Sequence, residues 1–508
     1  MSSIVCNANE VTHILKNLNA YKSPGPDHLP PRVLKECAVE LAPSLCELLN
    51  RSFSSSSIPR IWKQADIVPI HKKGSKTARE NYRQISLTSI ACKVCEKIVK
   101  NRVLNFWNEL NVFNPIQFGF LEGKSTLTQL LSCYNDWALS RNKSTPTDVV
   151  FLDFTKAFDL VPHERLLLKL KGYGIEGDLL QWFRNYLSNR EQRVVVRGTF
   201  SSWSHVKSGV PQGTILGPIL FLIYVNDISS NISSCIRMFA DDTKVYRELT
   251  NPEVDTQTLQ SDIDHLVNWA SQWQLRFNPE KCEVMRITHN RDKSVPSYII
   301  GSKIKSVKCA KDLGVLISSD LSWSTHVDAV VSKANKVLGV IQRTLGPSNQ
   351  EAFSILYKTL VRPILEYAVP LWSPYLVKDI LALEKVQRRA SRLALGQRRG
   401  DMDYKDRLLK LNWPTLEDRR LFISLVECYK TVFGLNSLNF NDFFVFSNDI
   451  RTRSNHSYKL YIKCPKINCY KYSFFTRIIK DWNSLPRHIV EAESFNIFKS
   501  KLKTYLKL

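Results

Sequence analysis

The sequence contains no long hydrophobic run. Its longest apolar stretch covers residues 215–225 and is followed at once by Asn226 and Asp227, whereas a membrane-spanning helix needs about 20 apolar residues. Residues 1–10 lack the basic and then apolar pattern of a secretory signal. We therefore expect no transmembrane helix, and the 12 cysteines are expected to be reduced thiols rather than a disulfide framework.

Glycine and proline are also scarce, at 18 and 22 of 508 residues, which excludes a collagen-like or low-complexity chain. With 44% hydrophobic and 10% aromatic residues the chain can form a core, so a disordered protein is excluded. Acidic residues are outnumbered by basic ones, 47 against 71, and the net charge is +24. This charge favours nucleic acid as a partner, then an anionic membrane surface, although a merely basic soluble protein has the same composition.

The pattern of apolar residues predicts an α+β chain in which helices alternate with hairpins. Short β-branched or aromatic runs predict strands at residues 65–70, 148–151, 192–197, 203–207, 236–239 and 243–246. Helical spacing predicts helices at residues 11–20, 32–52, 90–110, 164–170, 177–187, 217–227, 254–274, 327–345, 349–365, 379–395 and 416–432. Because the last four follow one another without strands, we expect domain boundaries near residues 320 and 440.

Two acidic segments place carboxylates where they are unusual. Asp153 ends an apolar run within residues 151–159 (Phe-Leu-Asp-Phe-Thr-Lys-Ala-Phe-Asp), where burial disfavours a charge. Asp241 and Asp242 are adjacent at an apolar hairpin tip, and like charges this close repel each other. A divalent cation removes this repulsion, because Mg²⁺ prefers carboxylate oxygens together with substrate phosphates. Taken singly, Asp241 and Asp242 also fit a solvated turn, and Asp153 fits a helix N-cap.

A glycine-rich segment, residues 208–218 (Ser-Gly-Val-Pro-Gln-Gly-Thr-Ile-Leu-Gly-Pro), lies between the two acidic ones. Its glycines permit close backbone approach, and its last proline suits the first turn of a helix. In this order the three segments resemble the palm of reverse transcriptases, a small antiparallel sheet backed by helices. Further segments resemble non-LTR (LINE-type) retrotransposon polymerases, most of all the jockey and CR1 types: residues 21–29, 81–98, 117–126 and 481–486.

This resemblance implies an RNA-directed DNA polymerase with right-hand architecture. It implies an N-terminal extension over residues 1–53, fingers and palm over 54–318, a helical thumb or connection over 319–440 and a basic C-terminal region over 441–508. The implied partners are an RNA template, a DNA primer or target and dNTPs, with no membrane, inside the nucleus and cytoplasm. Nothing in the sequence specifies an oligomeric state.

The resemblance also implies a catalytic metal site. Asp153, Asp241 and Asp242 match the metal-binding aspartates of the family, which would hold two Mg²⁺ ions, or Mn²⁺, for an in-line phosphoryl transfer. The carbonyl of Phe154 would help to hold the metal that accompanies the triphosphate. Lys281, in an Asn-Pro-Glu-Lys segment, matches a palm lysine that would protonate pyrophosphate.

Five residues match substrate-binding positions of the family. Phe158 matches the aromatic steric gate, whose ring would exclude a ribose 2′-OH; its alternative is a core aromatic. Lys72 and Arg83 match basic fingers residues that grip the triphosphate, and their alternative is a solvated basic face. Gln212 and Gly213 match the loop near the nucleotide and template.

Other segments receive structural interpretations. Leu313 and Gly314 match the turn of the primer-grip hairpin. Cys92 and Cys95 have the spacing of a redox or zinc pair, but on a predicted helix core packing is favoured. Because Cys464 and Cys469 lack further ligands at zinc-knuckle spacing, no zinc site is expected.

Residues 451–508 carry 13 Lys and Arg against 3 Asp and Glu, a net charge of 13 − 3 = +10. The basic residues alternate with aromatic ones, which suits single-stranded RNA, with core packing as the alternative. The 53 residues before the fingers leave no room for an endonuclease, so we expect a truncated element product or a partial gene model. Two other functions stay open: a catalytically inactive RNA-binding relic and a group II intron-type maturase.

Overall fold

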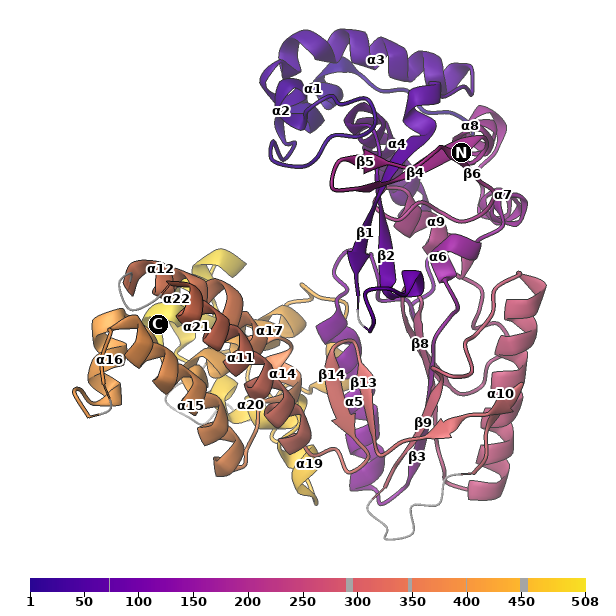
Figure 1. Ribbon diagram of the computed structural model, residues 1–508. Helices are drawn as coiled ribbons and strands as arrows, with labels where there is room; N and C mark the ends of the chain where they lie inside the picture. Colours follow the sequence, from indigo (N-terminus) through magenta and orange to yellow (C-terminus); the bar gives the residue numbers. More distant parts are fainter. Residues whose placement is uncertain (73, 289–295, 346–349, 399, 448–455) are drawn as a thin grey trace. The chain divides into compact units, whose positions relative to one another are not determined.

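The computed structural model describes residues 1–508 except 73, 289–295, 346–349, 399 and 448–455. It is a mixed α+β structure with several sheets and many helices, as the sequence predicts (Figure 1). The chain divides into two compact units. Unit 1 contains Met1–Phe120, Leu152–Thr243 and Ser261–Lys281, and unit 2 contains Leu121–Phe151, Lys244–Gln260 and Cys282–Leu508. The boundaries at residues 53, 318 and 440 stay predictions.

Two helices of unit 1, those that start at Ala8 and Ile90, follow residues whose side chains cap the first turn. The side chain of Ser89 accepts a hydrogen bond from Cys92 N–H at the start of α4. The single helix predicted over residues 32–52 is two helices, because Cys37 takes a non-helical conformation between them (φ −96°, ψ 31°). The helices are α1 (Ala8–Lys16), α2 (Pro31–Glu36), α3 (Ala38–Ser54), α4 (Ile90–Glu109), α6 (Ala157–Leu160), α7 (His163–Gly172), α8 (Gly177–Leu187) and α9 (Gly217–Tyr224), with short 3₁₀ turns at Arg60–Lys63 and Arg79–Asn81.

Unit 1 contains a sheet with β1 at its centre. β1 pairs antiparallel with β2 and parallel with β4. β4 also pairs antiparallel with β5 and β6, so the partner predicted near residues 203–207 is confirmed. The strand β2 was not predicted. The bounds are β1 (Gln64–His71), β2 (Tyr82–Leu87), β4 (Arg190–Val196), β5 (Thr199–Phe200) and β6 (Ser204–Val206).

A second sheet has the strand order β12-β9-β3-β8-β7. Its strand β3 is rich in β-branched and aromatic residues, and most of it is buried. Asp148 within β3 is fully buried and forms an ion pair with its cross-strand partner Arg286, at 2.7 Å. Its carboxylate also accepts a hydrogen bond from the hydroxyl of Tyr298, at 2.7 Å. The bounds are β3 (Thr147–Leu152), β7 (Cys235–Phe239), β8 (Asp242–Glu248), β9 (Glu283–Ile287) and β12 (Lys305–Ser306).

Two short hairpins complete the strands of unit 2. In one of them, β13 (Cys309–Asp312) and β14 (Val315–Ser318) pair antiparallel. Its turn residues Leu313 and Gly314 both have positive φ, 43° and 89°, as a tight hairpin turn requires. The hairpin implied at these residues is therefore present. The other hairpin joins β10 (Ile299–Ile300) to β11 (Ser302–Lys303).

One large hydrophobic core runs through unit 2, from Leu130 on α5 to Leu502 on α22.

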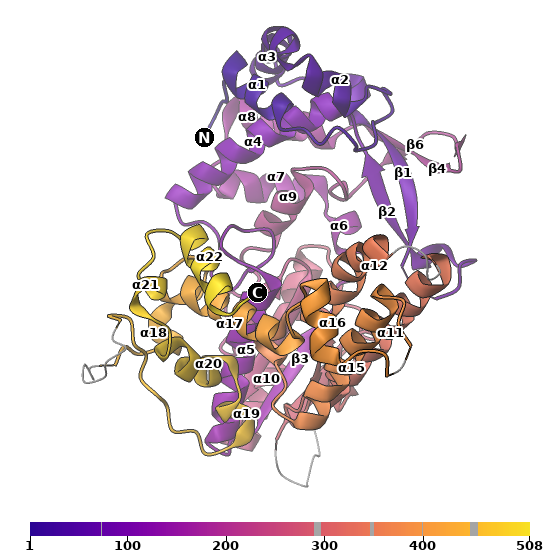
Figure 2. The same cartoon turned by 90° about the vertical axis from the view of Figure 1, so that its left-hand side faces the viewer.

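The helix α5 was not predicted. The helix predicted over residues 349–365, whose first residue lies outside the described ones, is interrupted by a π-helical turn at Tyr357–Val361. Figure 2 shows the C-terminal helices α17, α20 and α22, which pack together. The helices are α5 (Thr126–Asn142), α11 (Ser324–Leu345), α12 (Gln350–Leu356), α13 (Arg362–Glu366), α14 (Val369–Trp372), α15 (Val377–Ala394), α16 (Tyr404–Leu411), α17 (Leu416–Val432), α18 (Phe440–Phe443), α19 (Asn468–Lys471), α20 (Phe474–Asn483), α21 (Arg487–Val490) and α22 (Phe495–Tyr505). The residues of α10 (Pro252–Gln272) are assigned to unit 2 up to Gln260 and to unit 1 from Ser261.

The aromatic residues of the C-terminal segment mostly belong to this core. Tyr470, Phe474, Phe475 and Trp482 are buried, so they cannot stack on RNA bases while the unit is folded. For these four the packing interpretation holds and the RNA-stacking interpretation is wrong; Tyr461 is exposed, and residues 451–455 lie outside the described ones.

Two further sequence-based interpretations concern burial and the membrane. Cys92 and Cys95 are buried on α4, 2% and 1% exposed, and burial raises the pKa of both thiols. Core packing is therefore confirmed for this pair. None of the described helices combines the length and hydrophobicity that crossing a bilayer requires.

Candidate active site

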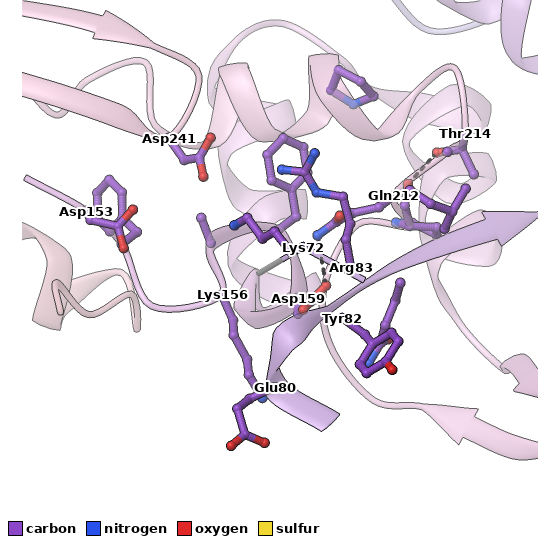
Figure 3. Close-up of a pocket in the computed structure, with 18 of the residues that line it drawn as sticks. Lys72, Glu80, Tyr82, Arg83, Asp153, Lys156, Asp159, Gln212, Thr214 and Asp241 are labelled. Atoms are coloured by element: carbon purple, nitrogen blue, oxygen red, sulfur yellow. Dashed lines mark hydrogen bonds between the residues drawn. The ribbon is translucent and has the colours of Figure 1, made fainter. Parts of the chain in front are cut away.

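A cavity of about 820 Å³ opens in unit 1 (Figure 3). It lies among β2, the segment after β3, the loop before α9 and the turn after β7. Its volume is within the range of about 300–1,000 Å³ that is usual for small-molecule sites. Every site residue predicted from the sequence except Asp242 lines this cavity: Lys72, Arg83, Asp153, Phe154, Phe158, Gln212, Gly213, Asp241 and Lys281.

Asp153 follows β3 directly, and backbone pairing fixes its position. Its carbonyl accepts a hydrogen bond from Asn278 N–H at 2.8 Å. The next residue, Phe154, forms an antiparallel bridge with Phe277, and their rings stack with centroids 4.3 Å apart. The hydrogen bonds of this bridge flank the Phe154–Phe277 pair, so the carbonyl of Phe154 points away from it.

Asp241 lies in the tight turn between β7 and β8. The preceding Ala240 has a positive φ of 55°, and its N–H donates to Oε1 of Gln117 at 2.8 Å. The same Oε1 accepts from Gly119 N–H at 2.8 Å, and Gln117 is 3% exposed. This buried amide, which the sequence analysis did not single out, therefore holds the turn that carries Asp241. The only signal for it was its place in the family-like segment 117–126.

Burial raises the pKa of Asp241, because a carboxylate loses hydration there. The neighbouring carboxylate of Asp153 raises this pKa further, whereas the cations of Arg83 and Lys72 oppose the shift. In Figure 3 the two carboxylates lie on the left of the cavity, with Lys72 and Arg83 towards the centre. The cavity thus brings an acidic pair and a basic pair together.

Lys281 makes the closest cationic contact of the acidic pair. Its Nζ lies 2.8 Å from Oδ2 of Asp153, in an ion pair whose lysine side chain is 54% exposed. A turn fixes the lysine, because its N–H donates to the carbonyl of Asn278 at 3.0 Å. Lys281 can therefore leave Asp153 at little energetic cost, since ion pairs this exposed contribute only about 0–1 kcal/mol.

Phe158 has both a packing contact and a cavity face. Its ring stacks on that of Phe221 in α9, with centroids 4.5 Å apart and planes 19° apart. The residue is half-buried and lines the cavity. Its two sequence-based interpretations, gate and core aromatic, therefore do not exclude each other.

The loop that precedes α9 is held by backbone hydrogen bonds on two sides. Ser86 N–H in β2 donates to the carbonyl of Gln212 at 2.8 Å, and Val210 N–H donates to the carbonyl of Phe158 at 2.8 Å. Gly213 has φ 109°, and a Cβ built on it would lie 2.7 Å from the carbonyl oxygen of Ser86. Only glycine fits this close approach of loop and strand.

Asp159 is a cavity residue that the sequence analysis missed. Burial raises its pKa, its Oδ1 accepts a hydrogen bond from Nε2 of Gln212 at 3.4 Å, and its carbonyl accepts one from Ser208 Oγ at 3.0 Å. No local sequence pattern marked Asp159 as a site residue, because its partners Gln212 and Ser208 are about fifty residues away in the chain.

The donor atoms at the acidic end suit a hard divalent cation. Two carboxylates and a backbone carbonyl offer only oxygen ligands, which Mg²⁺ prefers, and the raised pKa of Asp241 marks a site where added positive charge is favourable. Asp242 begins β8 with an exposed side chain and is absent from the cavity wall. Within the described part of the chain, no three His, Cys, Asp or Glu side chains form a metal-binding group.

Comparison with known proteins places these residues within a family. The sequence model described as "Reverse transcriptase (RNA-dependent DNA polymerase)" matches residues 70–341. The match includes every predicted site residue. It thus covers more than half of the chain.

Several curated proteins are similar to the chain. An "RNA-directed DNA polymerase from mobile element jockey" of Drosophila melanogaster is 28% identical over 420 residues, which is 79% of this chain and 46% of that protein. The "Probable RNA-directed DNA polymerase from transposon BS" of the same species is 26% identical over 75% of this chain and 44% of that protein. A "Probable RNA-directed DNA polymerase from transposon X-element" is 27% identical over 76% and 44%. The chain therefore spans a little under half the length of these relatives.

Proposed function

Because the chain belongs to the reverse transcriptase (RNA-dependent DNA polymerase) family, we propose that it extends a DNA primer on an RNA template. The observation that carries this proposal is the single cavity in which Asp153 and Asp241 face Lys72 and Arg83. In the proposed reaction the 3′-OH of the primer attacks the α-phosphate of a dNTP, and pyrophosphate leaves. The similarity to proteins named after mobile elements extends the proposal to an element of the non-LTR class.

The basic side chains bind the triphosphate in this proposal. Lys72 and Arg83 are exposed and line the cavity, so they reach phosphate oxygens without breaking a core contact. Fixed cations near a transferring phosphoryl group stabilise charge that develops there. Lys281 donates a proton to the leaving pyrophosphate, which its ammonium group is able to do from the cavity wall.

The sugar and base of the nucleotide contact the other walls. The ring of Phe158 is held by Phe221, so it cannot swing aside for a ribose 2′-OH, and the substrate is a dNTP. Gln212 and Gly213 lie beside the nucleotide and the template base. Their loop keeps its position because β2 and α6 hold its backbone.

Asp153, Asp241 and the carbonyl of Phe154 would hold two Mg²⁺ ions, or Mn²⁺, with Asp242 as an additional ligand. When bound, such ions stabilise the attacking and leaving oxygens of an in-line transfer. The protein contributes the placement of the carboxylates, through the backbone pairing of Asp153 and the turn that carries Asp241. Asp242 is the least supported of these ligands, because its side chain does not line the cavity.

The right-hand architecture is also part of the proposal, with fingers and palm in residues 54–318, a helical thumb in 319–440 and a basic C-terminal region in 441–508. Two helices of the proposed thumb support a nucleic-acid partner. On α15 the acidic residues Asp379 and Glu384 are buried, and α11 has no acidic residue after Asp328. After Asp328, all the exposed charged side chains of α11 and α15 are basic: Lys333, Lys336, Arg343, Lys378, Lys385 and Arg388. A surface of this kind binds phosphates and releases counterions.

Primer extension on poly(rA)/oligo(dT) with Mg²⁺ tests the proposal. The purified chain should incorporate dTTP, and Asp241→Asn should lower the rate by about 10³-fold or more, since a lost metal ligand costs several kcal/mol of transition-state stabilisation. RNA affinity of the variant should stay unchanged, because Asp241 does not belong to the basic surface. Binding of RNA without extension by the wild-type chain would instead identify the inactive relic.

A further inference from the structure

Glu96 is a buried carboxylate outside the cavity. It lies in the middle of α4 and is 0% exposed. Burial of an ionised carboxylate is costly unless hydrogen bonds replace its hydration. Three donors meet this side chain: Ile215 N–H at 2.6 Å, Tyr186 O–H at 2.8 Å and Cys92 Sγ at 3.6 Å.

The first of these donors belongs to the cavity wall. Ile215 directly follows Gln212, Gly213 and Thr214, all of which line the cavity. The first half of this loop is held at the carbonyl of Gln212 by Ser86. The second half of the loop is attached to α4, because Ile215 N–H donates a hydrogen bond to Oε2 of Glu96. Ile215 lies two residues before α9 begins at Gly217.

Two further features surround the side chain of Glu96. Unpaired N–H groups give the N-terminus of a helix a partial positive charge, so a carboxylate beside the start of α9 is stabilised. The buried guanidinium of Arg190 stacks on the ring of Tyr186, 4.9 Å from its centroid, and donates to the Tyr186 carbonyl at 3.0 Å. The cluster therefore includes a cation near the hydroxyl that donates to Glu96.

We propose that Glu96 is a positioning residue for nucleotide binding, which acts by holding the Gln212–Thr214 loop against the cavity. The inference rests on the proposed polymerase function, because it assigns the loop a role towards the dNTP. Glu96 touches neither the substrate nor the metal site. Without its carboxylate the loop keeps its attachment to β2 but loses the one to α4, so nucleotide affinity falls more than the rate of the chemical step.

Three variants separate this role from a merely structural one. Glu96→Ala removes all three contacts. Tyr186→Phe removes the hydroxyl donor and keeps the bond to Ile215, so it is the matched control for disturbing the buried cluster. Glu96→Gln keeps an acceptor for Ile215 N–H and presents an amide N–H to the Tyr186 oxygen, so it should restore the wild-type behaviour.

Hydrogen–deuterium exchange gives a readout that needs no activity. In Glu96→Ala the peptide covering residues 208–218 should exchange at least about ten times faster than in the wild type, whereas in Tyr186→Phe and Glu96→Gln its exchange should stay within about two-fold. Unchanged protection in folded Glu96→Ala would overturn the attachment, whether or not the wild type extends a primer. If Glu96→Ala does not fold, Glu96→Asp, which shortens the side chain by one methylene, takes its place in the same comparison.

Steady-state primer extension then tests the nucleotide role. Glu96→Ala should raise KM for dTTP by about ten-fold or more with a smaller change in kcat, and Tyr186→Phe should leave KM within about two-fold. An equal rise of KM in both variants, or none in Glu96→Ala, would contradict the proposal. Absence of extension by the wild type contradicts the polymerase function instead, and the exchange result shows whether the loop attachment survives that outcome.

Discussion

Replacing Gly213 by alanine should disturb the cavity more than replacing Gly198, another glycine of unit 1. Gly213 has φ 109°, a conformation that residues with a Cβ avoid, and its Cβ would lie 2.7 Å from the Ser86 carbonyl oxygen. That oxygen belongs to β2, so it cannot rotate away as a side chain would. Gly198 is the matched control, because it also has a positive φ, 81°, but a Cβ there has no atom within 4 Å.

The expected magnitudes follow from these two environments. In Gly198→Ala only the backbone conformation is strained, which costs about 1–2 kcal/mol of unfolding free energy. In Gly213→Ala the strained backbone costs about 1–3 kcal/mol, and separation of loop and strand also breaks the hydrogen bond from Ser86 N–H to Gln212, worth about 0.5–1.5 kcal/mol. The total for Gly213→Ala is therefore about 1.5–4.5 kcal/mol.

Urea denaturation of both variants measures the unfolding free energies, and primer extension measures KM for dTTP. Gly213→Ala should be the less stable variant and should raise KM, because the loop moves away from the nucleotide. Gly198→Ala should keep the wild-type KM. Equal destabilisation of the two variants, or a wild-type KM in Gly213→Ala, would refute the close packing of this loop on β2.

Three other variants test the cavity. Asp241→Asn should be more stable than the wild type at pH 7, because burial and Asp153 raise the pKa of Asp241 and its charged form therefore destabilises the fold. The difference should shrink in urea titrations as the pH falls through this raised pKa towards the ordinary value of 3.8, because the folded wild type then takes up a proton. Phe158→Val should increase rNTP incorporation relative to dNTP and should cost about 0.5–1.5 kcal/mol through the lost stacking on Phe221; an unchanged nucleotide ratio would leave Phe158 as a core residue only. Lys281→Met should lower kcat by about 10²-fold in single-turnover extension while changing stability by at most about 1 kcal/mol, because its ion pair is half-exposed, and a wild-type kcat would remove the proton-donor role.

Sequence patterns predicted the helices that have one apolar face. The predicted bounds of α8 and α17, Gly177–Leu187 and Leu416–Val432, are those observed. The helix α5 escaped prediction because it is buried on nearly every side and buries polar side chains such as Gln129 and Asn135, so its apolar spacing is blurred. The strand β2 was not predicted because only one of its six residues is buried, so its alternation of buried and exposed residues is weak.

The candidate site was predictable where chemistry is carried by charged residues in short motifs. Asp153 and Asp241 stand out as carboxylates in apolar surroundings, and the cavity brings them together. The residues that support them were not predictable. Gln117 and Glu96 contact backbone groups about 120 residues further along the chain, and no local pattern reports such a partner.

The core of unit 2 has a consequence for the order of synthesis. Its residues on α5 leave the ribosome long before those on α22, although both belong to one hydrophobic cluster. At about 5–20 residues per second, the stretch from Asn142 to Phe495 takes roughly 20 to 70 s to translate. During that interval Leu130 and Trp137 have no C-terminal helices to cover them. The core of unit 2 is therefore complete only when the helices α20 to α22 have been translated. A nascent chain stalled before them exposes apolar surface that is prone to aggregation.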